Sequence, residues 1–93
     1  MIELTDGERK VMIGLAQGLS VSAIAHRLSL SRGTIYRRVG DVGYKCGWEG
    51  RSFRTAAIVG RAASLGLLDF GLRLSEDGRV VTSVSAAVRK STY

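Results

Sequence analysis

Arginine side chains gather in the central third of the chain. Residues 27–61 contain eight cationic side chains, seven of them arginine, against two acidic ones, Asp41 and Glu49. This third therefore carries the whole formal excess of +6. The planar guanidinium of arginine suits two-point hydrogen bonding to phosphate and to guanine. The cluster could thus bind a polyanion, although a solvated surface that keeps a small protein soluble accounts for the charge equally well.

Other reactive side chains are few. The chain has one cysteine, Cys46, and one histidine, His26. These counts exclude an intrachain disulfide, a cysteine zinc site and a multi-histidine metal site. The serines have no histidine partner in a recognisable arrangement, which argues against nucleophilic catalysis. We expect no enzyme activity, no cofactor and no metal, with Cys46 as a buried, inert thiol.

The elements that must position these side chains belong to one small domain. The chain has 93 residues, of which 45% are hydrophobic and 24% charged, an ordinary globular balance. No apolar run approaches the roughly 18–20 residues of a membrane span, and no signal-peptide pattern opens the chain. We therefore expect a soluble, cytoplasmic protein.

Serine and threonine residues ahead of apolar stripes predict where the helices begin. Thr5 and Glu8 fit a capping box, and Ser20 and Ser31 fit simple caps. Helices are expected over residues 6–17, 21–28, 32–45 and 53–65. The turn over residues 29–31 joins the second and third of these helices, which is typical of a helix-turn-helix. In that motif the second helix enters the major groove of DNA and its N-terminal residues reach the base edges.

A different pattern follows Gly66. Residues 72–74 alternate between apolar and charged side chains, which is typical of a strand. Asp77-Gly78 is typical of a hairpin turn, and residues 79–82 can form the returning strand. A lone hairpin is marginal in water, so it must pack on the helices. The expected fold is mainly α, a three- to four-helix bundle that contains a helix-turn-helix, with a small C-terminal β-hairpin.

An ordered set of residues runs through these elements: Leu4, Thr5, Glu8, Val11, Met12, Ala16, Gly18, Ile24, Ala25, Leu28, Ser31, Thr34, Ile35, Lys45, Gly47 and Arg51. In this order the chain resembles the DNA-binding domain of LuxR/GerE-type transcription regulators. The resemblance implies that residues 1–67 form that domain and that residues 68–93 are a C-terminal extension. The family usually joins this domain to a receiver or ligand-binding domain, but at 93 residues we expect it to stand alone, without a sensor or receiver domain. It also implies a bacterial cell, or one infected by a phage.

The chain departs from the family pattern at several positions. Gly7 stands in place of an arginine, Ala23 of a glutamate, Tyr36 of a lysine and Arg38 of a histidine, and Gly40 stands where members often carry a longer polar residue. These departures alter the base sequence that the protein would read. The stretch from residue 18 to residue 37 is also similar to the helix-turn-helix of serine recombinases.

The resemblance and the outward face of residues 32–45 together give the expected contacts. Contacts with base edges are expected from Arg32, Tyr36 and Arg37. Contacts with phosphates are expected from Ser31, Thr34, Arg38, Lys45 and Arg51, although Arg51 can instead pair with Asp41 or Glu49. The fourth helix commonly forms a dimer contact in this family, which implies that Ile58, Arg61, Ala62 and Leu65 lie at a homodimer interface.

Three hypotheses follow. The first is a sequence-specific regulator of transcription that binds double-stranded DNA, as a homodimer, with residues 32–45 in the major groove. The alternative is a protein-interaction module on the same fold, either an antagonist of a larger regulator or a phage protein that binds a host factor. A recombinase-type DNA-binding arm is a third, less favoured hypothesis. A regulatory protein partner held through residues 67–93 is also expected.

Overall fold

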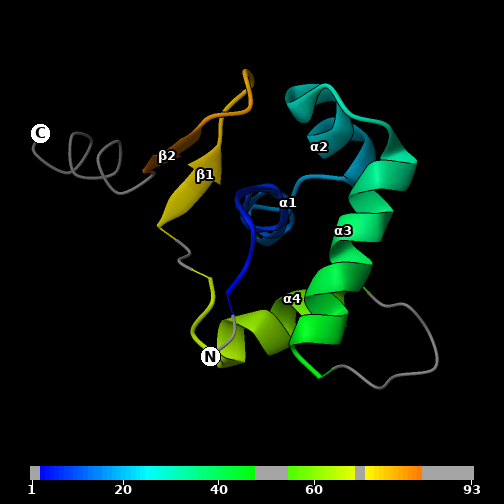
Figure 1. Cartoon of the computed structure of the whole chain (residues 1–93). Coiled ribbons are helices and arrows are strands. Elements are labelled where there is room, and N and C mark those ends of the chain that lie inside the picture. Colours follow the sequence, from blue (N-terminus) through cyan, green and yellow to red (C-terminus); the bar gives the residue numbers. More distant parts are fainter. Residues whose placement is uncertain (1–2, 48–54, 69–70, 83–93) are drawn as a thin grey trace, which may run out of the picture.

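The computed structural model describes residues 3–47, 55–68 and 71–82 (Figure 1). The elements are α1 (Asp6–Ala16), α2 (Val21–Leu28), α3 (Arg32–Lys45), α4 (Thr55–Ser64), β1 (Leu72–Leu74) and β2 (Val80–Thr82). The mainly helical fold with a small hairpin is therefore confirmed. α2 and α3 have the expected bounds, and α1 ends one residue early. The expected first residues of the fourth helix and its cap, Ser52, lie outside the described residues.

The predicted caps set the starts of the first three helices. The Thr5 hydroxyl accepts the Glu8 N–H at 3.1 Å, and the Glu8 carboxylate accepts the Thr5 N–H at 2.8 Å, which completes the capping box. Ser20 accepts from the backbone of Ala23 at the start of α2. Each cap satisfies a backbone donor that the helix itself leaves without a partner.

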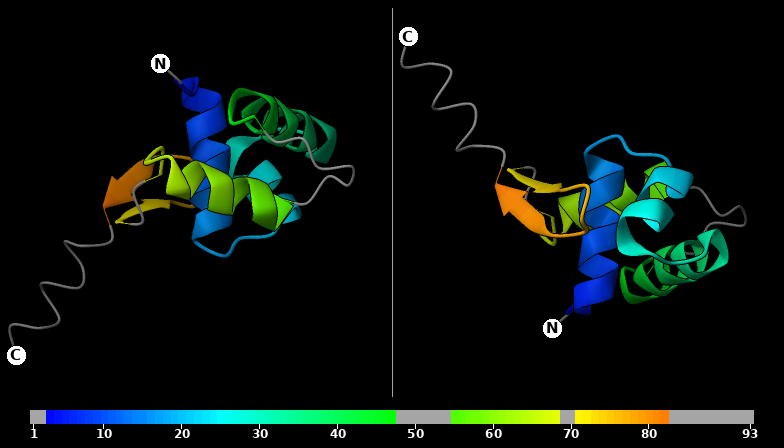
Figure 2. Two further views of the ribbon diagram at one scale, coloured as in Figure 1. Left: turned by 90° about the horizontal axis from the view of Figure 1, so that it is seen from below. Right: turned by 90° about the horizontal axis from the view of Figure 1, so that it is seen from above.

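α1 lies at the centre of the molecule. In the views from below and above, α3 is on one side of α1 and the hairpin is on the other (Figure 2). α1 contacts each of the other helices and β1. The apolar faces meet in one core whose largest fully buried side chains are Met12, Ile24, Ile35, Ile58, Leu74, Val11, Val39 and Val42. A shared core of this kind fixes α3 relative to the rest of the domain.

The hairpin belongs to the same packed unit as the helices. β1 and β2 are antiparallel, and the Leu74 side chain is 1% exposed within the helical core. The Leu74 N–H donates to Oε1 of Gln17 at 2.7 Å, and its carbonyl accepts from Nη1 of Arg27 at 2.6 Å. Residues 71–82, expected as part of an extension, therefore complete the core of the helix-turn-helix unit.

The hairpin turn also contacts the end of α2. Gly78 has φ +83°, and a Cβ at that position would lie 2.7 Å from the carbonyl oxygen of Arg27. Glycine is needed there for both the backbone conformation and the close approach. Among the described helices, none has the length and apolar character needed to span a bilayer.

Candidate nucleic-acid interface

The turn between α2 and α3 is short and fully specified by hydrogen bonds. Ser29 ends α2 with φ +56°, in the left-handed region, and the Leu30 N–H donates to the carbonyl of Ala25 at 2.9 Å. Ser31 then caps α3 by accepting the Thr34 N–H at 3.2 Å. The chain thus reverses in the three residues expected of a helix-turn-helix. The angle between the two helices is set locally, before any ligand binds.

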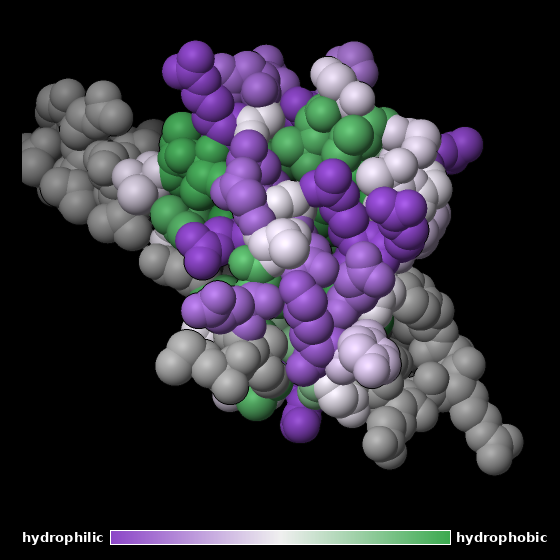
Figure 3. All heavy atoms as spheres, in the orientation of Figure 1, coloured by the Kyte–Doolittle hydropathy of each residue, from purple (hydrophilic) through white to green (hydrophobic). Residues whose placement is uncertain are grey.

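α3 has a fully buried inner face and a polar outer face. Ile35, Val39 and Val42 are 0% exposed, as their spacing predicted. The exposed residues on the other side are Arg32, Gly33, Tyr36, Arg37, Asp41 and Tyr44. In the orientation of Figure 1, hydrophilic side chains cover much of the visible surface, and the hydrophobic patches lie mainly over the hairpin and α2 (Figure 3). The outer face of α3 is therefore a solvated surface with cations and aromatic rings.

Arg32 and Arg37, the cations of this face, form no ion pair with any residue in the described part of the chain. The ion pairs among the described residues join Lys10 to Asp6, Lys45 to Glu8, and Arg79 to Asp77. Neither Arg32 nor Arg37 takes part in them. Their guanidinium groups are exposed and able to bind an anionic partner.

Lys45 differs from the other cations of α3 because an ion pair engages its ammonium. Its ammonium lies 2.6 Å from Oε1 of Glu8 and 3.2 Å from the carbonyl oxygen of Glu3. Burial by itself would raise the pKa of the Glu8 carboxyl, but the hydrogen bonds from Lys45 and Thr5 outweigh it and hold that pKa below its usual range. Lys45 therefore ties α3 to α1, and a DNA phosphate at this position would have to compete with the Glu8 carboxylate.

Comparison with known families agrees with this geometry. The sequence model of the bacterial regulatory proteins of the luxR family matches residues 3–51, which is more than half of the chain. The chain belongs to the luxR family. Its matched segment includes the whole of α1, α2 and α3. No curated protein and no solved structure matches the chain significantly.

In this luxR-family domain, the first turn of α3 carries two of the expected phosphate ligands. The hydroxyls of Ser31 and Thr34 lie 2.9 Å apart and share a hydrogen bond. Ser31 is the cap that was expected, and it is exposed. Both hydroxyls are therefore committed to the helix start, where they also border the positive end of the α3 dipole. The remaining expected phosphate ligand outside α3, Arg51, lies outside the described residues.

The expected dimer residues divide into two groups. Ile58 and Ala62 are 0% exposed, because the apolar stripe of α4 faces the core of its own chain. That burial does not fit a contact with a second chain. Leu65 is 40% exposed and Arg61 is exposed, with its Nε donating to the carbonyl of Cys46 at 3.2 Å. Only these two of the four present surface to another molecule.

Cys46 is buried, as expected, beside α4. The side chain is 3% exposed. Burial raises the pKa of its thiol, against the opposing charge of Arg61. A thiol held in its neutral form is a poor nucleophile, which fits a packing role.

The sequence did not indicate two features near the outer face of α3, one at Tyr44 and one at Gly7 of α1. Tyr44 is 87% exposed on α3, two helical turns beyond Tyr36 on the same outer face. Its eight-residue spacing from Tyr36 was the signal that could have found it. The second feature is the contact of Gly7 with Arg38, whose guanidinium lies directly against the backbone of Gly7. Two departures from the family pattern, at Gly7 and Arg38, therefore meet in space.

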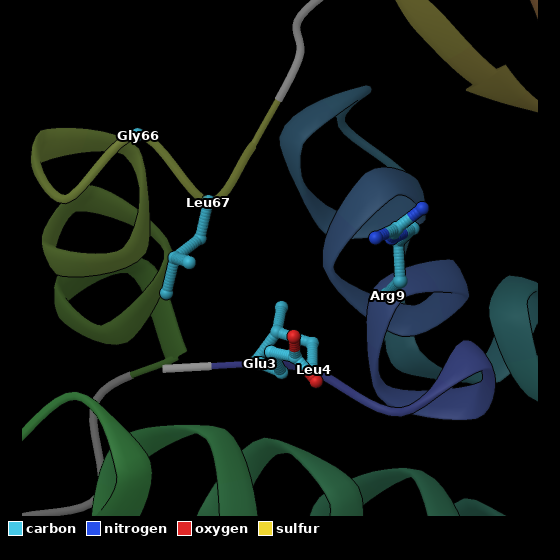
Figure 4. Close-up of a pocket in the computed structure, with 5 residues that line it drawn as sticks. All are labelled: Glu3, Leu4, Arg9, Gly66 and Leu67. Carbon is cyan, nitrogen blue, oxygen red and sulfur yellow. The ribbon is translucent and has the colours of Figure 1, made fainter. Parts of the chain in front are cut away.

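A hollow away from the outer face of α3 has no evident chemistry. It has a volume of about 380 Å³ and lies between α1 and the segment after α4 (Figure 4). Its lining residues are Glu3, Leu4, Arg9, Gly66 and Leu67. They do not pair a nucleophile with a base. Among the described residues, no group of three or more His, Cys, Asp or Glu side chains could hold a metal ion.

Proposed function

We propose that the protein binds double-stranded DNA in a sequence-specific manner and regulates transcription in a bacterial or phage-infected cell. The observation that carries the proposal is the outer face of α3. It exposes arginine and tyrosine side chains free of ion pairs with the described residues, while the inner face is locked into the core. A helix held in this way fits the major groove. Membership of the luxR family, whose members are DNA-binding regulators, supports the same function.

The proposed contacts follow the exposure of the side chains. Arg32, Tyr36 and Arg37 reach base edges, since they occupy the N-terminal half of α3, where such helices enter the groove. Tyr44 extends the contact toward the C-terminal end of α3. Phosphate contacts are proposed for Ser31, Thr34, Arg38 and Arg51. Lys45 acts indirectly, by holding α3 on α1 through Glu8.

We also propose that two copies bind together. Leu65 and Arg61 are the exposed members of the expected contact on α4. A homodimer would read a two-fold site with half-sites about 10 base pairs apart. Sedimentation of the wild type and of Leu65→Glu tests this part. We expect the variant to be a monomer that keeps its helices, and a wild type that is monomeric at all concentrations contradicts the proposal.

A regulatory partner at residues 67–93 remains a prediction. Truncation after residue 68 cannot test it, because the truncation would also remove Leu74 from the core. Val81 is 45% exposed on β2 and offers a milder change. We expect Val81→Glu to leave the fold and DNA affinity unchanged while weakening capture of the partner. Equal capture by both proteins contradicts a contact at β2.

The DNA-binding proposal is tested by selection from a random duplex pool, followed by measurement of affinity against salt concentration. We expect a recovered motif, a preference for it over an unselected duplex, and a slope of about −0.9 for each phosphate contact. Arg37→Ala should lose the preference, and Arg73→Ala, which removes an exposed arginine from β1, should keep it. Equal binding to both duplexes contradicts sequence specificity. The absence of binding at low salt overturns the proposal in favour of a protein-interaction module.

A further inference from the structure

The first turn of α1 has a notch that the Arg38 side chain fills. A Cβ at Gly7 would lie 1.6 Å from Nη1 of Arg38, 2.6 Å from Cζ and 3.3 Å from Nη2. The guanidinium therefore lies directly against the backbone of α1, in space that any other residue at position 7 would occupy. Arg38 comes from α3, so this contact joins the start of α1 to the middle of α3.

The hydrogen-bond donors of the Arg38 guanidinium have no partner among the described residues. Within the described part of the chain, it makes neither an ion pair nor a hydrogen bond. The two carboxylates in the first turn of α1 are engaged elsewhere: Glu8 with Lys45 at 2.6 Å, and Asp6 with Lys10 at 3.5 Å. The notch fixes where the Arg38 cation lies without neutralising it.

We infer that Gly7 is a positioning residue. Because it has no side chain, the Arg38 guanidinium can pack against the first turn of α1, where it is placed to bind a DNA phosphate. The inference rests on the proposed DNA-binding function. Arginine loses conformational freedom when it binds, and a side chain already held in place loses less of it. The planar guanidinium is also suited to two-point contact with phosphate oxygens. Gly7 thereby adds to DNA affinity without contacting DNA through a side chain.

The variant Gly7→Ala tests this inference because stability and binding should change in different ways. Alanine favours a helix over glycine, and the displaced atoms are the far end of a flexible side chain. We therefore expect an unchanged or higher Tm. Alanine at position 7 would occupy the place of the Arg38 guanidinium, so we expect the phosphate contact to be lost. On a mixed-sequence duplex of about two helical turns, the salt slope should then fall in magnitude by about 0.9. The ratio of wild-type to Gly7→Ala affinity should therefore be about eightfold larger at 0.1 M salt than at 1 M.

Gly60→Ala is the matched control. Gly60 is an exposed glycine of α4, and a Cβ there would meet no atom within 4 Å. We expect this variant to raise helix stability in the same way while leaving the salt slope and the affinity unchanged. A loss of affinity in Gly60→Ala equal to that in Gly7→Ala would overturn the inference, because the effect would then not depend on Arg38.

A double-mutant cycle separates positioning from a general effect on the fold. We expect Arg38→Ala to lose the same phosphate contact, and Gly7→Ala to have no further effect in that background. Additive losses, or a Gly7→Ala protein with wild-type slope and affinity, overturn the inference. If Gly7→Ala lowers the Tm below the assay temperature, a wild-type slope in Arg38→Ala still overturns it. Failure of the wild type to bind the duplex removes the proposed function itself, so the two failures are distinguishable.

Discussion

Replacing Glu8 with glutamine should measure how strongly the ion pair holds α3 on α1. The Glu8 side chain is 6% exposed and its carboxylate accepts hydrogen bonds from Lys45 at 2.6 Å and from the Thr5 N–H at 2.8 Å. Glutamine keeps an acceptor for Thr5 but removes the charge. Lys45 is 32% exposed and can turn toward water, so the loss is close to one charge-assisted hydrogen bond. We expect Glu8→Gln to lower the free energy of unfolding by about 1.5–3 kcal/mol.

The pH dependence of the stability difference between wild type and Glu8→Gln shows whether the charge of the Glu8 carboxylate causes it. The pKa of Glu8 is lower in the folded protein than its ordinary value of 4.5. The ion pair therefore adds stability that is fully present above about pH 4.5 and is lost as the pH falls through the lower, folded pKa. The difference in stability between wild type and Glu8→Gln should be constant from pH 7 to pH 6. It should shrink toward zero below pH 4.5.

Urea unfolding followed by circular dichroism, with thermal scans beside it, measures this difference. A domain of this size shifts its Tm by about 4–8 °C for each kcal/mol. Asp6→Asn is the control, because it breaks the exposed pair with Lys10 and should cost about 1 kcal/mol or less. An equal loss in both variants, or a Glu8→Gln difference that persists unchanged down to pH 3, refutes the reasoning.

Other consequences follow from burial and backbone geometry. Ile35→Ala should cost about 2–5 kcal/mol in urea unfolding, because its side chain is fully buried. Arg37→Ala should change stability by about 0.5 kcal/mol or less and weaken binding to a selected duplex by about 1–3 kcal/mol; unfolding of this variant would mean that the outer face of α3 is assigned incorrectly. Gly78→Ala should cost about 1–3 kcal/mol by thermal scan, since its φ is +83° and a Cβ would contact the carbonyl of Arg27; a wild-type Tm contradicts this. Cys46 should react with a thiol reagent at neutral pH only as fast as the protein unfolds, and rapid labelling of the folded protein contradicts its burial.

The helices and their caps could be predicted because the interactions that set them are local. The capping box of Thr5 and Glu8 spans three residues, and the Ser31 cap reaches Thr34. The buried stripe of α3 follows from its own spacing. These short-range signals are enough to give the helix-turn-helix and the outward position of Arg37.

The remaining features depend on contacts between residues far apart in the chain. The ion pair of Lys45 with Glu8 could not be predicted, because Glu8 lies 37 residues away and no local pattern pairs the two. The hairpin was expected, whereas its attachment to the core depends on the bonds between Leu74 and Gln17, 57 residues apart. The burial of Ile58 likewise depends on the direction in which α4 packs.

The most direct test of the DNA-binding face is a titration of the isotopically labelled protein with a selected duplex, followed by backbone amide shifts. The account predicts the largest shifts over residues 31–37 and at Arg38, reversed by added salt, with small shifts in β1 and β2. Amide chemical shifts in α3 that stay unchanged at saturating duplex would contradict the claim that the outer face of α3 binds DNA. Shift changes confined to α4 and the hairpin would contradict it as well.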